Sequence, residues 1–351
     1  MRTTLGHLRA RLELSSASAS TATTATLLVG VLVLQLAMIG SYVGALHAPK
    51  ARNVPIAIVG PPSAIAPVRD RLARGGILDP RTVATPTGAL AMIDDRQVYA
   101  ALIPGQKTDR LVVAPAASAA VAELLPSALA RLEPAGRRLA VQTVKPLPAN
   151  DPRGISPFYL VVGWLVGGYV GATVLGLARG GVPRTRRWAA RRLGALACYA
   201  VASGVLGTLL VHDVVGVLEG HTLALAATGT LLVFATGAAT AALQAALGIA
   251  GTALAILLFV AVGNPASGGP LATELLMPTP WRAVGWLLPP GAGTTLVRNI
   301  TYFDGNAIGR AAFVLAAYSL VGSLVVLALA RRGRATTSLE AEVSAAASIA
   351  A

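Results

Sequence analysis

Four side chains that can bind a metal ion lie close together in the sequence. They are His212, Asp213, Glu219 and His221, which share one short polar stretch. Imidazole nitrogens and carboxylate oxygens are ordinary ligands of zinc. A metal site needs its ligands at fixed spacing on a rigid element, and this stretch shows no such pattern. We therefore favour a solvated loop, and the sequence predicts no metal ion or other cofactor.

Other reactive groups are sparse. The single cysteine, Cys198, lies inside an apolar run, where a thiol serves as a small packing residue. The adjacent carboxylates Asp94 and Asp95 lie at the end of a predicted helix, and we interpret them as the solvent-exposed end of that helix rather than as a binding site. No GxxxxGK[ST] motif occurs, in which a glycine-rich loop and a lysine hold nucleotide phosphates. The sequence therefore predicts neither an enzyme nor a nucleotide-binding subunit.

The composition predicts a membrane protein. The chain has 351 residues, of which 54% are hydrophobic and 13% are charged, and its mean hydropathy is +0.66. Soluble domains carry about 25% charged residues, and disordered chains have low hydrophobicity. These values exclude an ordinary cytosolic enzyme and a disordered chain.

Six uncharged apolar stretches are long enough to span a bilayer, which takes about 20 helical residues. They are residues 27–46, 157–177, 193–211, 222–243, 245–263 and 311–330. The first follows a basic start, as in a signal peptide, but such peptides have apolar cores of about 7–15 residues. We expect the first span to be retained. The predicted fold is an α-helical polytopic membrane protein with six transmembrane helices.

The arginines predict the orientation, because Lys and Arg are enriched in short cytoplasmic loops. They gather in residues 1–26, 179–192 and 331–351, whereas the loop 212–221 has none. Six spans place those three basic segments on one side, so a cytoplasmic N-terminal segment (1–26) and a cytoplasmic tail (331–351) are predicted, in a plasma membrane. The net charge of +14 then reflects topology in a lipid bilayer, and no nucleic acid partner is predicted.

Residues 48–156 have the pattern of a small extracytoplasmic α/β domain between helices 1 and 2. Strand-like runs alternate with helix-like runs, which is typical of α/β units. Strands are expected at 54–59, 82–84, 98–103, 111–113 and 139–144, and helices at 63–73, 85–96 and 116–132.

The five-helix membrane domain, 157–330, contains an unusual segment at 264–310. Its tryptophans Trp281 and Trp286 are followed by Pro289 and Pro290. Indole rings favour the membrane–water interface, and irregular backbone at membrane depth requires cover by protein or a wet cavity. Two interpretations remain: re-entrant or interfacial half-helices, or a surface loop with a hydrophobic anchor.

Gly163, Gly167 and Gly171 are spaced four residues apart and share one helical face. Small residues at this spacing let helices approach closely. We favour packing within the chain over a seam between two copies.

The order of parts resembles a known family. One span, an outside domain and five further spans resemble the ABC type-2 transporter permeases, in particular the phage-infection-protein-like (YhgE/Pip) branch. Short stretches carry the resemblance: 88–90, 96–104, 158–160, 163–164, 167–169, 264–269, Pro278, 281–282, 288–291 and 302–305. The resemblance implies a permease subunit of an ATP-driven exporter, a homodimer or heterodimer served by a separate ATPase subunit.

The arginine-rich loop has two interpretations under this resemblance. Its members are Arg184, Arg186, Arg187, Arg191 and Arg192. They set the topology and contact anionic lipid, or they also contact the ATPase as a coupling loop. An ion-coupled carrier is disfavoured, because such carriers place ionisable groups within their spans. The alternative function is a membrane-anchored receptor or scaffold whose extracytoplasmic domain binds an envelope component or phage.

Overall fold

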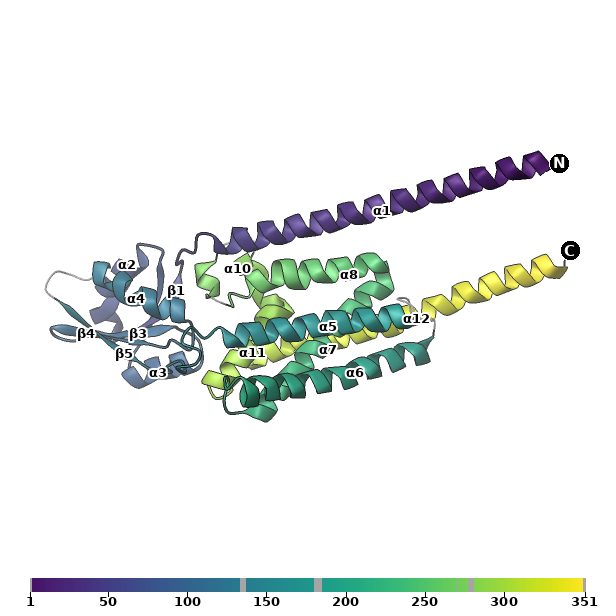
Figure 1. The fold of residues 1–351 in the computed structure, drawn as a ribbon. Helices are drawn as coiled ribbons and strands as arrows, with labels where there is room; N and C mark the ends of the chain where they lie inside the picture. Colours follow the sequence, from purple (N-terminus) through teal and green to yellow (C-terminus); the bar gives the residue numbers. More distant parts are fainter. Residues whose placement is uncertain (1, 133–136, 180–184, 270, 277–280, 350–351) are drawn as a thin grey trace.

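The computed structural model describes residues 2–132, 137–179, 185–269, 271–276 and 281–349 (Figure 1). In these residues, six helical segments are long and apolar enough to cross a membrane. They are Thr24–Leu46, Ser156–Ala178, Arg186–Val214, Thr222–Leu247, Ile249–Ala266 and Gly309–Ala330. The prediction of a mostly helical chain with six such segments and a small α/β sheet is confirmed.

The helices form a bundle around α7, Thr222–Leu247 (Figure 1). Around it lie α5 (Ser156–Arg179), α6 (Arg186–Leu209) and α12 (Gly309–Ile349). The helix α6 continues into a π-helical turn, η1 (Leu210–Val214). Small residues on α7 allow the close packing, since a Cβ on Gly237 would lie 2.7 Å from Leu196 of α6.

The next span consists of α8 (Ile249–Ile256), the π-helical segment η2 (Leu257–Gly263) and α9 (Asn264–Ala266). The first helix, α1 (Arg2–Leu46), contacts this span mainly through its C-terminal end and otherwise runs apart from the bundle (Figure 1). There Asn264 donates a hydrogen bond to the Tyr42 hydroxyl (3.3 Å). The apolar side chains of α1 between Leu27 and Val43 are largely exposed, as expected for a helix that faces lipid.

The α/β unit is a five-stranded sheet with the order β2-β1-β3-β4-β5. Its strands are β1 (Val54–Val59), β2 (Leu78–Val83), β3 (Ala100–Ile103), β4 (Thr108–Val113) and β5 (Arg138–Thr143). All pairs are parallel except β3 with β4. Alternate residues of each strand point to opposite faces, which gives the sheet two apolar cores.

Helices cover both faces of this sheet. The helices α2 (Pro62–Ala73) and α4 (Ala119–Leu132) bury Ile65, Leu72 and Leu125 against one face. The helix α3 (Pro86–Asp94) buries Ala89 and Ile93 against the other face. Thr85 caps α3 by accepting a hydrogen bond from the Gly88 backbone N–H (3.1 Å), as its position before a proline predicts.

After α9, segment 264–310 contains short turns followed by a 14-residue helix that packs against the bundle. It begins with short turns, η3 (Thr273–Leu275), α10 (Trp281–Val284) and η4 (Gly285–Leu287), and continues as α11 (Pro289–Tyr302). At 14 residues, α11 is about 21 Å long, too short for a bilayer core of about 30 Å. Most of α11 is buried, and it contacts α5, α7 and α12. Residues 289–302 therefore pack within the bundle.

Candidate functional site

The α/β unit and the bundle meet at a junction whose central residue is Arg298 of α11. Its side chain is 8% exposed. The guanidinium donates to three backbone carbonyls: Ala117 (3.3 Å), Gly154 (3.1 Å) and Gly269 (3.2 Å). These carbonyls belong to the α/β unit, the connector before α5 and the segment after α9. One cation therefore joins three separate parts of the chain.

Burial of this cation has an electrostatic cost. Desolvation and, to a smaller extent, the nearby positive charge of Arg96 together lower the pKa of Arg298 to about 10. Arg96 donates to the same Ala117 carbonyl (3.2 Å), and burial lowers its pKa as well. Two cations that share one acceptor repel each other. The carbonyl acceptors must offset this repulsion as well as the loss of hydration.

Phe303, directly after α11, extends the junction into the core of the sheet. It is fully buried against one face of the sheet, in a cluster with Ala57, Ala101 and Val112. The guanidinium carbon of Arg96 lies 5.0 Å from the centroid of its ring, within the range of a cation–π contact. The bundle therefore supplies a core residue to the α/β unit.

The opposite face of the sheet is joined to the bundle through η3. Ala272 and Leu275 lie in the same apolar cluster as the core residues of α2 and α4. Beside them the Tyr99 hydroxyl donates to the Glu274 carboxylate at 2.6 Å. Burial raises the pKa of Tyr99, and the negative charge of Glu274 adds to the increase. Both faces of the sheet thus depend on residues from the segment between the last two spans.

The predicted coupling arginines lie at the other end of the bundle, and the structure separates them. Arg184 is outside the described residues. Arg186, Arg187 and Arg191 are exposed on the first turns of α6, which Thr185 caps by accepting from the Trp188 N–H (3.2 Å).

Arg192 differs from its neighbours because it points into the bundle and is 3% exposed. It donates to the Ala172 carbonyl (2.9 Å) and to the Gln244 side-chain oxygen. Gln244 in turn donates to Thr173 (3.2 Å) and Thr252 (2.9 Å). Arg192 therefore ties α6 to α5, α7 and α8, and this conformation leaves it no surface for a partner protein.

The three spaced glycines of α5 have different surroundings. A Cβ on Gly167 would lie 3.1 Å from the Tyr199 hydroxyl, and one on Gly171 would lie 2.9 Å from the Tyr199 ring. Both glycines therefore pack against α6 of the same chain. A Cβ on Gly163 would meet no atom within 4 Å, because this residue borders a cavity between α5 and α6.

The predicted interfacial residues pack against neighbouring helices. Trp281 donates its indole N–H to the Ser41 hydroxyl of α1 (2.8 Å). The Arg310 guanidinium lies 3.7 Å from the Trp286 ring centroid. Pro289 and Pro290 are buried at the start of α11, where proline fits because the first helical N–H groups need no partner within the helix.

The possible metal ligands are divided between two places. His212 lies 3.9 Å from Asp213, whereas His221 lies 3.7 Å from Asp304. Across the part of the chain that is described, no three His, Cys, Asp or Glu side chains form a group able to hold a metal ion.

The sequence predicts no role for Arg298, Phe303, Glu274 or Gln244. One usable signal was the pattern of α11, where Arg298 interrupts the apolar run of Leu296, Val297 and Ile300. No protein-family model, curated protein or solved structure matches the chain.

Proposed function

We propose that this chain is the membrane permease subunit of an ATP-driven exporter. It lies in the plasma membrane with both termini cytoplasmic and the α/β unit outside. A separate ATPase subunit supplies the energy, and two permease subunits form a homodimer or a heterodimer. The observation that carries the proposal is the junction, because it joins the α/β unit to the bundle on both faces of the sheet. A movement of the bundle would therefore reposition the outside unit.

The placement of the two ends supports this mechanism. The α/β unit lies at one end of the bundle, and the arginine-bearing start of α6 lies at the other (Figure 1). Arg186, Arg187 and Arg191 present an exposed positive surface at that end, which suits an acidic surface on an ATPase. A force applied there would pass along the continuous helix α6 toward the α/β unit.

Purification of the full-length chain from its native membrane tests the proposal. An ATP-hydrolysing subunit should co-purify with it, and ATP hydrolysis should persist in proteoliposomes. A triple charge reversal, Arg186→Glu with Arg187→Glu and Arg191→Glu, should reduce the co-purified ATPase at least tenfold. The proposal fails if no ATPase co-purifies.

A matched control reverses three exposed arginines of the α/β unit, Arg74, Arg110 and Arg138, to glutamate. The net charge changes by the same amount, so equal ATPase loss in both triple variants would overturn the assigned contact surface.

Site-directed labelling tests the orientation. In a Cys198→Ala background, Thr143→Cys on β5 should react with an impermeant thiol reagent added outside whole cells. Ala190→Cys on α6 should react only after the membrane is opened. Labelling of both cysteines from outside would overturn the assigned orientation.

The exposed edge strand β5 favours a second candidate, a membrane-anchored receptor or scaffold. In the described residues β5 pairs only with β4, and Val141 on it is half exposed. An open strand edge can pair with a strand of another protein. Under this function, Val141→Lys should abolish binding of an envelope component or phage to whole cells. Substitutions within the spans should leave that binding unchanged.

A further inference from the structure

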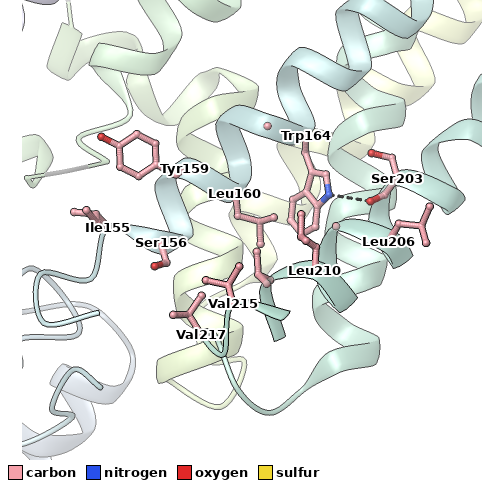
Figure 2. Close-up of a pocket in the computed structure, with 13 residues that line it drawn as sticks. Ile155, Ser156, Tyr159, Leu160, Trp164, Ser203, Leu206, Leu210, Val215 and Val217 are labelled. Atoms are coloured by element: carbon pink, nitrogen blue, oxygen red, sulfur yellow. Dashed lines mark hydrogen bonds between the residues drawn. The ribbon is translucent and has the colours of Figure 1, made fainter. Parts of the chain in front are cut away.

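An apolar cavity of about 600 Å³ lies between α5 and α6 at the end of the bundle next to the α/β unit. Figure 2 shows its walls, which are formed mainly by Leu160, Trp164, Leu206, Leu210, Val215 and Val217. Among the described lining residues, only Ser156, Tyr159 and Ser203 carry hydroxyl groups. We call this feature the α5–α6 cavity. Its lining suits a hydrocarbon ligand.

Trp164 forms a fixed wall of the α5–α6 cavity. Its indole N–H donates to the Ser203 carbonyl at 3.1 Å (Figure 2), so the polar atom of the ring is already paired. The ring fits between two glycines, because a Cβ on Gly207 or Gly229 would approach it within 2.4 or 2.5 Å. The wall therefore exists before any ligand arrives.

The dimensions of the cavity match half of a bilayer. Its α5 residues run from Ser156 to Trp164, a rise of about 12 Å along the helix axis. One leaflet contributes about 15 Å of a hydrocarbon core that is about 30 Å thick. The cavity therefore extends through most of one leaflet, on the side of the α/β unit.

The cavity is reachable from the surface where lipid chains lie. Tyr159 is 61% exposed and Leu206 is 64% exposed, and both belong to spans. Tyr159 lies near the start of α5, and tyrosine favours the membrane–water interface. An alkyl chain entering sideways would make dispersion contacts that an empty cavity lacks, without desolvating any charged group on its walls.

A positively charged residue lies in the connector just before the start of α5. Arg153 is exposed and precedes the lining residue Ile155 by two positions. Guanidinium groups bind phosphate through paired hydrogen bonds. We propose that the α5–α6 cavity binds one acyl chain of an anionic membrane phospholipid, with Arg153 contacting its phosphate headgroup. This site does not depend on the chain being a permease.

Fluorescence of Trp164 tests the site directly. A full-length variant with Trp188→Phe, Trp281→Phe and Trp286→Phe keeps Trp164 as its single tryptophan. In nanodiscs containing phosphatidylglycerol with brominated acyl chains, the fluorescence of Trp164 should be strongly quenched. The ring is only 3% exposed, and variants that fill the cavity test whether the quenching chain lies inside it.

Filling the cavity should remove the quenching. Gly163→Leu adds a side chain where no atom lies within 4 Å of the Cβ, and it should restore at least half of the lost fluorescence. Gly194→Leu on α6 is the matched control, since its Cβ is equally unobstructed and it does not line the cavity. Val215→Phe fills the same space from the other wall and serves as a second test. Equal quenching in the filled variants and the control would overturn the proposal.

Mass spectrometry of the purified chain identifies the source of the alkyl chain. One retained phospholipid per chain, lost in Gly163→Leu and kept in Gly194→Leu, supports the proposal. A retained compound that is not a phospholipid would overturn it. Arg153→Gln should weaken binding of brominated phosphatidylglycerol about tenfold and leave brominated phosphatidylcholine unchanged. An unchanged preference would overturn the assigned headgroup contact.

Discussion

Replacement of Arg298 by methionine should loosen the α/β unit from the bundle. Methionine keeps most of the length of the side chain but removes the hydrogen bonds from Arg298 to the carbonyls of Ala117, Gly154 and Gly269. The Ala117 carbonyl then keeps its bond from Arg96. A hydrogen bond to a charged group contributes about 1.5–3 kcal/mol. Three such bonds give roughly 4.5–9 kcal/mol before the cost of burying the cation is counted.

The cost of burial follows from the pKa of Arg298. A pKa of about 10 instead of the usual 12.5 corresponds to a penalty of about 3 kcal/mol on the charged form. The net loss in the variant is therefore roughly 1–6 kcal/mol, with about 3 kcal/mol as a central value. Since 1.4 kcal/mol is a factor of ten, the opening constant of the junction should rise about 100-fold.

Hydrogen exchange followed by mass spectrometry measures this opening, because it reports local unfolding segment by segment. Exchange should accelerate about 100-fold in peptides covering 267–275 and 298–305, while the buried middle of α7 should not change. Arg282→Met is the matched control, since Arg282 lies on the same segment and donates to only one described carbonyl, that of Arg52 (3.0 Å). If Arg298→Met accelerates exchange no more than Arg282→Met, Arg298 does not hold the junction.

Three further results are expected. Tyr302→Phe should stabilise the chain by about 1 kcal/mol, because its buried hydroxyl has no hydrogen-bond partner among the described residues. Tyr99→Phe should instead destabilise the chain by about 2 kcal/mol, because it removes the hydrogen bond to Glu274. Equal shifts of the two variants in thermal unfolding would contradict this prediction. Burial raises the pKa of the Tyr302 hydroxyl from 10.0 to about 12, so the folded state keeps this proton to higher pH than the unfolded state. The stability that results is complete below pH 10 and is lost between pH 10 and 12. Tyr302→Phe should therefore reduce the dependence of the unfolding free energy on pH in this range. Gly204→Ala should lower the free energy of unfolding by about 1–3 kcal/mol, because its Cβ would lie 2.5 Å from backbone atoms of α7. Gly194→Ala, whose Cβ meets no atom within 4 Å, should cause no loss of stability in the same thermal unfolding assay.

The sequence predicts elements well where local chemistry determines them. The strand expected at 54–59 has the same bounds as β1, because a short apolar run that ends at glycine and prolines predicts both a strand and the point where it ends. Thr85 caps α3 as expected. The expected strand at 82–84 is instead β2, Leu78–Val83, whose Asp79, Pro80 and Arg81 do not resemble a strand. β2 is an edge strand, and an edge tolerates proline and charge because one side of its backbone needs no partner.

The junction could not be predicted in the same way, because its acceptors carry no signature in the sequence. Arg298 binds three backbone carbonyls, one of them 181 residues away at Ala117, and every residue has a carbonyl. In the sequence, Arg192 cannot be distinguished from its exposed neighbours Arg187 and Arg191. Only the folded structure places Gln244 next to it. In both places, tertiary packing rather than residue type decides that the arginine is internal.

The two buried arginines have a mechanical consequence that neither has alone. Arg192 ties α6 to α5, α7 and α8 near the arginine-rich end of the bundle. Arg298 ties α11 to the connector before α5 and to the α/β unit at the other end. Each guanidinium is an obligate donor that stays charged at neutral pH, so neither contact can be lost without leaving a buried cation unpaired, which costs several kcal/mol. The helices α5, α6 and α7 should therefore move together with the α/β unit.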